Sequence, residues 1–375
     1  MIDTVCLLVP KHKLYFLSGI SSWDLYSKTD NYSKFVRNPS KTEKETGKYF
    51  PRLTGYSRRF GQDANVKMEF SVPKLLYLNN LDELEDKDFP EVIDVLRERL
   101  KDMGVIITMS LIENALVSSV HFSKNILIED GYTVNYLISE MNKADLRKSF
   151  DFAKTRYMND GQSLYAHTTA HQMVVYDKVA DLKKGKKRAI DKDPTLYQQS
   201  LFTKISGFQN FNEMKEILRF EIRLNHKQKL NKLLEKLGFD KNPTFKDVFN
   251  SDMSKKVVTE YWNGLIKERN LGIFSISLSF KEILQTLLVS RSKIGTKQAV
   301  YYLGLYALSR DGNGMRELRT IVTKKAHDRT WYRIAKDVRV AGELITKNKL
   351  RNWVKQIDDK LLDYKPYKYK KDENK

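Results

Sequence analysis

Apolar and polar residues alternate in several short segments, as they do in strands that bury one face of a sheet. The clearest case is EILRFEIRL at 216–224, where Leu218, Phe220 and Ile222 fall on one side and the charged residues on the other. The segment VKMEFSV at 66–72 has the same period. We predict further strands at 4–9, 105–112 and 115–123, and a short apolar strand at 173–175.

Other segments repeat their apolar residues every three or four positions, which is the period of a helix with one buried side. We predict helices around 92–100, 133–141 and 225–237, and helix after helix beyond residue 243. Ser279 and Glu282 have the spacing of a capping box at the start of a helix. The stretch 314–340 divides into two short helices around a turn near 325–328.

The order of these elements predicts an α+β fold with two domains and a tail. An antiparallel sheet with packed helices is expected over 1–242, and a helical domain over 243–362. The charged tail at 363–375 is expected to be disordered. A chain of 375 residues is long enough for two domains and a substantial core.

The charge balance favours a polyanionic partner. The chain has 67 Lys and Arg against 47 Asp and Glu, a formal net charge of +20. Such an excess favours nucleic acid before a membrane surface, although a merely soluble basic protein has the same composition. The one cysteine, Cys6, excludes an intramolecular disulfide and a cysteine-rich zinc site, and it suits a reducing cytoplasm. No apolar run approaches the ~20 residues that span a bilayer, so no membrane partner is expected.

Three groups of cations are candidates for contact with a nucleic acid. Arg58 and Arg59 lie among the tyrosines of 22–64, and interleaved Arg and Tyr suit phosphate contact together with base stacking. Arg329 and Arg333 share a face of the second short helix. A solvated hairpin and an ordinary helix bundle would give the same two patterns. The third group is the basic tract Lys183, Lys184, Lys186, Lys187 and Arg188.

Tyr176 is a candidate nucleophile. It follows the apolar run at 173–175, Lys178 comes two residues later, and the basic tract begins seven residues after it. Cations next to a tyrosine stabilise its phenolate and the oxygens of a phosphorus atom under attack. The chain has 20 tyrosines, and most tyrosines in strands serve in packing, which is the alternative role for Tyr176.

Three predicted strands each have one metal-capable side chain on their polar face: Glu69, His121 and Glu221. Two carboxylates and one imidazole, with no cysteine, suit Mg²⁺ or Mn²⁺ better than zinc. For Glu221 the alternative is an ion pair with Arg219 and Arg223. For His121 it is a hydrogen-bonded position in the core.

Few other residues form a recognisable catalytic pattern. His167 and His171 are four residues apart and are second-choice ligands, although the run that follows them has the pattern of a strand. There is no Gly-x-x-x-x-Gly-Lys run, so no ATPase or helicase engine is predicted, and there is no Gly-x-Ser-x-Gly elbow. The His-hydrophobic-His signature of the common rolling-circle initiators and relaxases is also missing.

Several segments, in the same order, are similar to segments of the gene II-type replication initiators of filamentous phages and their plasmid relatives. They are MIDTV, KMEFSVPKLL, ALVSSVHFSKN, HQMVVYDK, LRFEIRL, and the late YYLGLY and WYRIAKDV runs. The resemblance implies a catalytic core related to the HUH endonucleases and a rolling-circle initiator that nicks and rejoins one DNA strand at an origin. Such an enzyme becomes joined to the 5′ phosphate and leaves a 3′ hydroxyl for a polymerase.

Carried over by position, Tyr176 matches the nucleophile, Lys178 the basic residue two beyond it, and Glu221 the acid of the late strand. Glu69 matches an early acid, while His121 falls where phage members have an aspartate, which leaves its ligand role open. The resemblance implies Mg²⁺ or Mn²⁺ as cofactor, and origin DNA with a host polymerase and helicase as partners. It implies no small-molecule substrate, and the cytoplasm of a bacterial host as location.

Two other classes of function remain open. A non-catalytic replication or partition protein would bind the origin with the strands as a scaffold and Tyr176 in the core. A tyrosine recombinase would also form a phosphotyrosine, but its usual cluster of arginines and histidine around a late tyrosine is not matched in this sequence. Metal dependence separates these classes, because recombinases need no metal and a binding protein cuts nothing.

Overall fold

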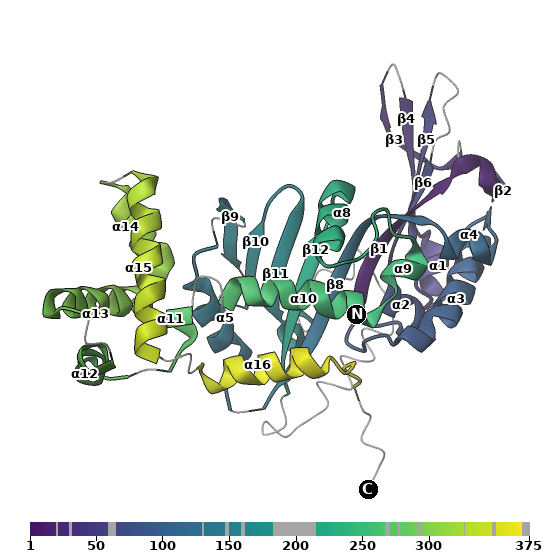
Figure 1. The fold of residues 1–375 in the computed structure, drawn as a ribbon. Coiled ribbons are helices and arrows are strands. Elements are labelled where there is room, and N and C mark those ends of the chain that lie inside the picture. Colours follow the sequence, from purple (N-terminus) through teal and green to yellow (C-terminus); the bar gives the residue numbers. More distant parts are fainter. Residues whose placement is uncertain are drawn as a thin grey trace, which may run out of the picture.

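The structure of the chain, a computed structural model, describes residues 1–19, 22–29, 32–58, 65–129, 131–146, 150–158, 162–182, 215–266, 271–276, 278–290, 294–325, 327–346 and 350–369. A long antiparallel sheet runs through the molecule, helices cover one face of its central strands, and a lobe of helices lies at one end (Figure 1). The predicted α+β class is confirmed.

The strands of the sheet lie in the order β3-β4-β5-β6-β1-β8-β12-β11-β10-β9, and neighbouring strands are antiparallel. Their bounds are β1 Ile2–Pro10, β3 Asp24–Lys28, β4 Tyr32–Arg37, β5 Arg52–Arg58, β6 Asn65–Ser71, β8 Leu116–Ile128, β9 Asp151–Met158, β10 Ser163–His167, β11 His171–Asp177 and β12 Glu216–Leu224. A small separate pair joins β2 Tyr15–Phe16 to β7 Val105–Ile106. The first strand therefore lies inside the sheet, between β6 and β8.

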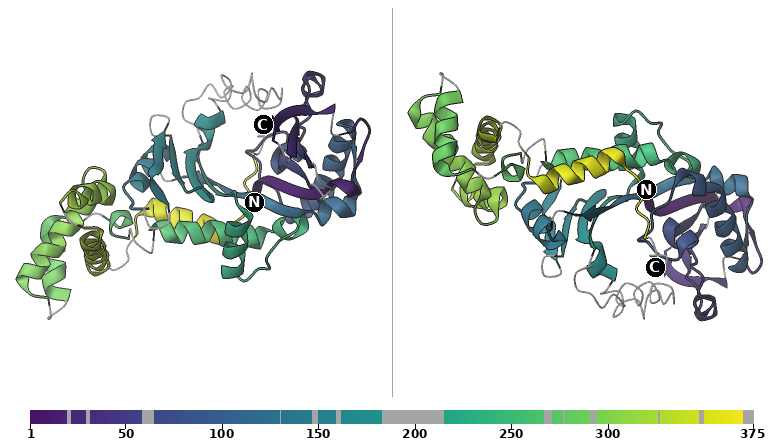
Figure 2. Two further views of the ribbon diagram at one scale, coloured as in Figure 1. Left: turned by 90° about the horizontal axis from the view of Figure 1, so that it is seen from above. Right: turned by 90° about the horizontal axis from the view of Figure 1, so that it is seen from below.

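Each central strand has an apolar and a polar face, because successive side chains point to opposite sides of a sheet. On β12, Phe220 and Ile222 are buried, and the Phe220 ring meets Trp262 of α10 edge-on at 5.9 Å. Arg219 and Glu221 occupy the opposite face. The helices on the apolar side include α8 Lys227–Lys236, α10 Ser251–Ile266 and α16 Asn352–Asp363, and α5 Val134–Asn142 packs against β10 and β11 (Figures 1 and 2).

Two segments differ from the elements that the sequence predicts. The run 105–112, expected as one strand, divides into β7 and the helix α4 Met109–Glu113, because the Thr108 side chain accepts a hydrogen bond from Leu111 N and caps the helix. The strand predicted at 66–72 ends at Ser71, and Val72 and Pro73 begin a helix, where the missing N–H of Pro73 has no partner to lose. The other helices of this part are α1 Lys41–Glu45, α2 Val72–Tyr77, α3 Phe89–Asp102 and α9 Phe245–Val248, with 3-10 turns η1 Lys11–Lys13 and η3 Asp86–Asp88.

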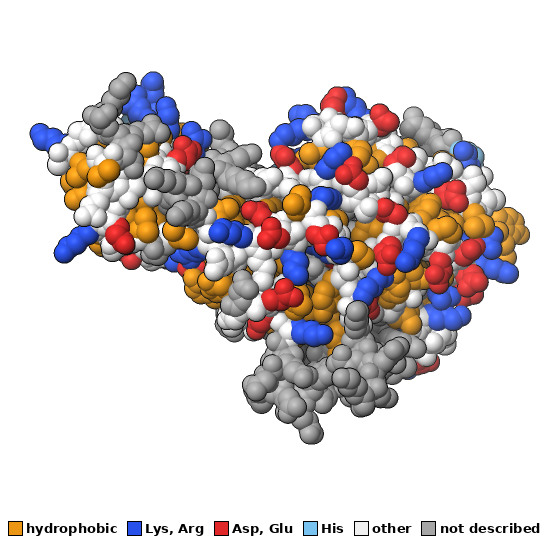
Figure 3. Space-filling model, turned by 60° about the horizontal axis from the view of Figure 1, so that its bottom comes forward, with side chains coloured by type: hydrophobic (Ala, Val, Ile, Leu, Met, Phe, Trp, Pro, Cys, Tyr) orange, Lys and Arg blue, Asp and Glu red, His pale blue; other side chains and the backbone are white. Residues whose placement is uncertain are grey.

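The residues after 243 divide between the core beneath the sheet and a separate lobe of helices. Trp262 of α10 and Trp353 of α16 are fully buried in the core beneath the sheet, so the expected domain boundary at 242/243 falls inside one core. Beyond α11 Leu271–Phe274, a lobe contains α12 Phe280–Ser290, α13 Thr296–Arg310, α14 Gly314–Thr323 and α15 Asp328–Thr346. It has an apolar cluster of its own, formed by Ile283, Leu287, Ala299, Tyr302, Tyr306, Ala341 and Ile345. Figure 3 shows the lobe as a separate bulge of the surface.

Two helical features that the sequence predicts are present in this lobe. Ser279 and Glu282 form the predicted capping box, with Ser279 N donating to Glu282 Oε2 at 2.8 Å. Two helices are predicted over 314–340, and α14 ends at Thr323 and α15 begins at Asp328, but α15 is longer than predicted and extends to Thr346. No helix among the described residues is long and apolar enough to cross a membrane.

Part of the expected disordered tail is ordered. Tyr367 N donates to Glu83 Oε2 at 2.8 Å, and Tyr367 O accepts from Glu83 N at 2.9 Å. Glu83 is also paired with the buried Lys124, whose Nζ donates to the Lys365 carbonyl at 2.7 Å. Disorder is therefore wrong for 364–369, because a buried ion pair fixes this segment, while 370–375 lie outside the described residues.

Gly314 lies where α14 of the lobe meets Lys143 of the sheet part, and Gly314→Ala should weaken this contact. The residue has φ +59°, and a Cβ atom would lie 2.7 Å from the Ser309 carbonyl oxygen and 2.8 Å from Lys143 Cβ. We expect the free energy of unfolding, measured by chemical denaturation, to fall by more than about 1 kcal/mol. Gly304→Ala on α13 is the matched control, because an added Cβ meets nothing within 4 Å there. Equal decreases in the two variants would contradict the proposed contact.

Candidate active site

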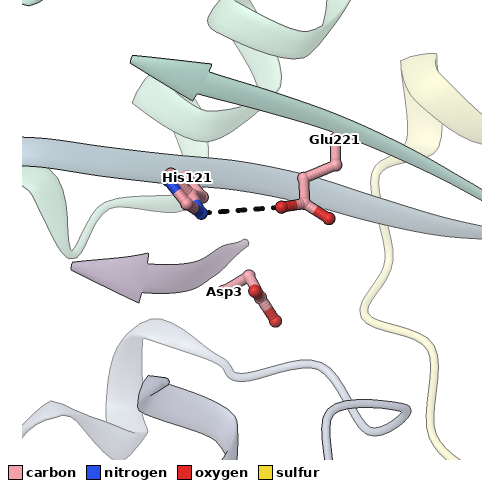
Figure 4. Close-up of side chains that lie close together, drawn as sticks. All are labelled: Asp3, His121 and Glu221. Atoms are coloured by element: carbon pink, nitrogen blue, oxygen red, sulfur yellow. Dashed lines mark ion pairs between the residues drawn. The ribbon is translucent and has the colours of Figure 1, made fainter. Parts of the chain in front are cut away.

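The polar face of the central strands forms a cavity of about 350 Å³. Residues of β1, β6, β8, β10, β11 and β12 line it, together with Asn80, Gln162 and Asp181. Asp3, His121 and Glu221 lie close together inside it on three adjacent strands, and Figure 4 shows His121 directed at Glu221 with Asp3 beside them. The cavity therefore collects charged groups from distant parts of the sequence.

Asp3 reaches the polar face through an irregularity in β1. Strict alternation would place Asp3 on the apolar side with the buried Val5. The register between β1 and β8 shifts between Ile2 and Thr4, so that two residues of β1 lie opposite His121 alone. Because of this bulge both Asp3 and Thr4 line the cavity, and Thr4 Oγ1 donates a hydrogen bond to Asp3 Oδ2 at 3.0 Å.

Two arginines of β12 hold the buried carboxylates. Arg219 Nη2 donates to Asp3 Oδ1 at 2.6 Å, and Arg219 Nε lies 3.6 Å from Glu221 Oε2. Arg223 Nε donates to Glu221 Oε1 at 2.8 Å. Arg219 is 1% and Glu221 2% exposed, so water screens these charges little. The ion pairs considered for Glu221 are thus present, and they coexist with its place in the cavity.

The arginines keep both carboxylates ionised. Burial is the largest influence on Asp3 and alone would raise its pKa, but Arg219, Lys178 and His121 together with the Thr4 hydrogen bond lower that pKa to about 2. Burial is likewise outweighed at Glu221, where Arg223 and Arg219 hold the pKa below its ordinary value. For His121, burial lowers the pKa of the imidazole more than the Glu221 charge raises it. His121 is therefore neutral at pH 7 and can offer a nitrogen lone pair.

Tyr176 lies opposite Arg219 in the pairing of β11 with β12, on the face that carries Glu221. Its hydroxyl donates a hydrogen bond to Glu221 Oε2 at 3.2 Å. Burial raises the pKa of this phenol well above its ordinary value, although the Arg219 charge acts in the opposite direction. At rest the Tyr176 side chain is a neutral phenol, and its hydroxyl donates a hydrogen bond to the Glu221 carboxylate.

Lys178 follows β11 and is 1% exposed. Its Nζ donates to Asn80 Oδ1 at 2.9 Å and to Asp181 Oδ2 at 3.4 Å, and it lies 5.7 Å from the centre of the Tyr176 ring. Burial, and then the Arg219 charge, lower the pKa of Lys178 to about 8. An amine with this pKa can donate a proton close to neutral pH.

Asp3, His121 and Glu221 can each offer one metal-ligand atom, and these atoms lie within 4.8 Å of one another. Two expected ligands thus meet, and Asp3 takes the place expected for Glu69, which lines the same cavity with an exposed side chain outside this group. Carboxylate oxygens and imidazole fit Mg²⁺ or Mn²⁺. Since Arg219 and Arg223 already balance both carboxylates, a divalent cation would bind more readily together with an anion such as phosphate.

The remaining candidates lie away from the cavity or outside the described residues. His171 packs its ring against Phe150, with centroids 4.9 Å apart, at the opposite end of β11 from Tyr176. His167 ends β10 beside it. The candidates for contact with a nucleic acid divide as follows: Arg329 and Arg333 are exposed on α15, Arg58 ends β5 with its side chain undescribed, and Arg59 and the basic tract at 183–188 lie outside the described residues.

Asp3, Asn80 and Asp181 belong to the site but were not identified from the sequence. Asp3 had one signal, since it is a lone charge within the apolar segment IDTVCLLVP, and such a charge in a strand indicates a bulge or a buried partner. Asn80 had none beyond a turn, yet its side chain accepts from Lys178 and its carbonyl accepts from Arg219 Nη1 at 2.9 Å. Arg219 was seen only as an ion-pair partner, and it is the residue that contacts most of the others.

Comparisons with known proteins leave the family open. No family model matches the chain, and no curated protein and no solved structure matches it. The resemblance to the filamentous-phage initiators therefore depends only on the segments quoted above. The activity has to be argued from the residues of the cavity.

Asp3→Asn should destabilise the fold, because it leaves the buried Arg219 with one negative partner fewer. Breaking a buried ion pair costs about 3–5 kcal/mol, and we expect a loss of this order at neutral pH in urea unfolding. The folded pKa of Asp3 is depressed to about 2, so its stabilising effect is present above the unfolded pKa and is lost as the pH falls toward 2. The difference between wild type and Asp3→Asn should therefore narrow in acid.

Glu69→Gln is the matched control for this measurement. Glu69 faces the same cavity but is exposed, so its neutral variant should change the free energy of unfolding by no more than about 0.5 kcal/mol. If both variants lost the same stability, Asp3 would not be the partner on which Arg219 depends.

Proposed function

We propose that the protein is a site-specific DNA strand transferase that starts rolling-circle replication, with Tyr176 as its nucleophile. The observation that carries this proposal is the 3.2 Å hydrogen bond from the Tyr176 hydroxyl to Glu221 Oε2, beside the two arginines of β12. Attack on a phosphodiester is favoured when the hydroxyl is hydrogen-bonded to a carboxylate that can accept its proton and when cations surround it.

In the proposed reaction the Tyr176 oxygen forms a bond to phosphorus, and the bond from phosphorus to the 3′ oxygen breaks. Glu221 takes the phenol proton, and Arg219 stabilises the negative oxygen that results. Lys178, with its pKa of about 8, gives a proton to the departing 3′ oxygen. The products are a 5′ phosphotyrosine and a 3′ hydroxyl. Because the phosphoester bond energy is kept, the reverse reaction rejoins the strand without ATP.

Asp3, His121 and Glu221 are the residues that would hold Mg²⁺ or Mn²⁺, and a bound cation would polarise a phosphoryl oxygen. Arg223 would also stabilise the negative phosphoryl oxygen, because its guanidinium lies at the cavity wall against Glu221. Asn80 and Asp181 orient the Lys178 amine through their hydrogen bonds. The chain's own side chains therefore supply nucleophile, proton acceptor and proton donor.

Two exposed surfaces support DNA as the partner. β3, β4 and β5 project beyond the body of the sheet (Figure 1), and Tyr26 on β3 is 65% exposed with Lys34 Nζ 4.2 Å from the centre of its ring. Exposed aromatic and cationic side chains suit base stacking with phosphate contact. On the lobe, α15 has four exposed cations, Arg329, Arg333, Lys336 and Arg339. We assign the binding of origin DNA to these surfaces. A host polymerase and a host helicase would then act on the nicked DNA in a bacterial cytoplasm.

A second candidate function is strand transfer without a metal, as in tyrosine recombinases. The fold gathers Arg219, Arg223 and His121 around Tyr176, so the two arginines could balance the phosphate charge alone. To separate the two functions, the protein is incubated with supercoiled plasmid that bears the replication origin of the phage or plasmid encoding it. The incubation contains Mg²⁺, Mn²⁺ or a chelator. Nicking that survives the chelator supports the second candidate, and binding without nicking supports a non-catalytic protein.

Tyr176→Phe should abolish nicking, because it removes the attacking oxygen and leaves the ring in place. Origin binding, measured by gel shift, should stay within a few-fold of wild type. Wild type should form a denaturation-resistant adduct at the 5′ side of the nick, and peptide mapping should locate it on Tyr176. Tyr165→Phe is the matched control, since this tyrosine lines the same cavity and should retain activity. An adduct on another tyrosine, or cutting by water with no adduct, would refute the proposal.

His121→Ala should raise the Mn²⁺ concentration needed for half-maximal nicking. Removing a ligand weakens affinity at least as much as the roughly 10–100-fold that loss of an outer-sphere partner costs, and mass action at higher Mn²⁺ should restore activity. His121 is neutral at pH 7, so its removal leaves no unpaired charge. Glu69→Gln should keep the wild-type Mn²⁺ dependence. The reverse result would show that Glu69, and not His121, holds the metal.

A further inference from the structure

A second cavity, of about 440 Å³, lies between β11, α8 and α10 on the other face of the sheet from Tyr176. His171 and Met173 reach it from β11, and they alternate with Tyr176 along the strand. Its volume falls within the roughly 300–1,000 Å³ that ligand pockets occupy. The proposed strand transfer does not use this cavity.

Three rings form one wall of this cavity. The centroids of Phe150 and His171 are 4.9 Å apart, and the Tyr261 ring lies 5.8 Å from His171 and 6.2 Å from Phe150. The Tyr261 hydroxyl is buried and has no hydrogen-bond partner among the described residues. An aromatic wall with a buried unsatisfied hydroxyl favours a flat ligand that has polar atoms at its edge.

Lysines of α8 also line the cavity. Lys229, Lys232 and Lys236 all line the cavity, and their spacing of three and four residues puts them on one side of the helix. Lys236 is paired with Glu260, but no ion pair within the described part of the chain involves Lys229 or Lys232. Burial lowers the pKa of Lys229, and repulsion by the other two lysines lowers it further. A bound anion would relieve this repulsion.

We propose that this cavity binds a nucleotide, with its base against the rings of Phe150 and Tyr261 and its phosphate against Lys229 and Lys232. Base–aromatic stacking tolerates any base, and lysine binds phosphate as a point charge, so the site has little sequence preference. The nucleotide is either free or part of a single strand, since both present the same chemistry. In a strand, the cavity would hold DNA at a distance from the reacting phosphate.

The test uses full-length Tyr176→Phe protein, which lacks the nucleophile, so its result does not depend on whether Tyr176 transfers strands. Calorimetric titration at low salt compares three probes: inorganic phosphate, dTMP and a short oligo-dT. We expect dTMP to bind at least about fivefold more tightly than phosphate, because stacking of one base adds free energy of the order of 1 kcal/mol or more. No binding of dTMP, or equal affinity for dTMP and phosphate, would overturn the proposal.

Two variants assign the binding to this cavity. Lys229→Gln with Lys232→Gln should weaken dTMP binding, while Lys246→Gln with Lys281→Gln removes the same charge from exposed positions elsewhere and should not. Tyr261→Leu should weaken dTMP binding by about fivefold or more and leave phosphate binding unchanged. Thermal unfolding of each variant checks that the fold is intact. Equal weakening by both lysine pairs would show non-specific charge binding and refute the site.

The oligonucleotide distinguishes the two sources of the ligand. If the cavity holds a strand, oligo-dT should bind more tightly than dTMP, and the lysine variant should make the dependence of log affinity on log salt shallower. The slope should fall by roughly 0.7 for each phosphate that the variant no longer neutralises. If the ligand is a free nucleotide, dTMP should bind and oligo-dT should not compete with it. Binding of oligo-dT that neither Tyr261→Leu nor the lysine variant affects would place the strand on another surface and contradict the proposal.

Discussion

The fully buried guanidinium of Arg219 needs partners for its charge and its N–H groups, and the centre of the protein is arranged around that need. Its donors reach Asp3 from the first strand, the carbonyl of Asn80 and the side chain of Asn125 on β8. A buried cation without such partners would cost several kcal/mol, which is why β1 departs from regular pairing to bring a carboxylate to it. One side chain thus ties together segments more than 200 residues apart in sequence.

The same charges define what the cavity lacks. Five acidic residues line the cavity, Asp3, Glu69, Asp177, Asp181 and Glu221, whereas the cations beside them are Arg219, Arg223 and Lys178, so acidic groups outnumber basic ones in the empty cavity. A divalent cation would offset this excess and allow a phosphodiester to bind next to a phenol that keeps its proton while alone. The arrangement therefore discourages ionisation of Tyr176 in water and favours it when an anion and its counter-cation are present. Burial of Tyr176 therefore affects both when the phenol can ionise and how strongly the surrounding charges act on it.

Periodicity predicted five strands of the sheet, β1, β6, β8, β11 and β12, because strands such as β12 have a regular alternation, but it gave no strand for β9 or β10 and only an alternative hairpin for the region of β3 to β5. It failed where a local interaction overrides the pattern: the Thr108 cap turns an apolar run into a helix, and the bulge in β1 moves Asp3 to the other face. His121 and Glu221 could be named because each is a metal-capable side chain on the polar face of a predicted strand, and Tyr176 because cations follow it. Their meeting depends on strand order, which spacing does not encode. Glu69 satisfied the same sequence rule and lines the same cavity with an exposed side chain, but β6 lies outside the three adjacent strands β1, β8 and β12 that carry Asp3, His121 and Glu221.

The ordered segment at 364–369 has a consequence for how the protein is made. Tyr367 pairs with Glu83, and Glu83 is the partner of Lys124, which lies in the central strand β8. The loop that carries Glu83 also supplies Asn80 to the site, so this region cannot reach its final state until residue 367 has left the ribosome. Contacts of such long sequence separation slow folding, and they leave the early strands without their partners during synthesis. The growing chain would therefore have to wait, partly folded, before its candidate site could be assembled.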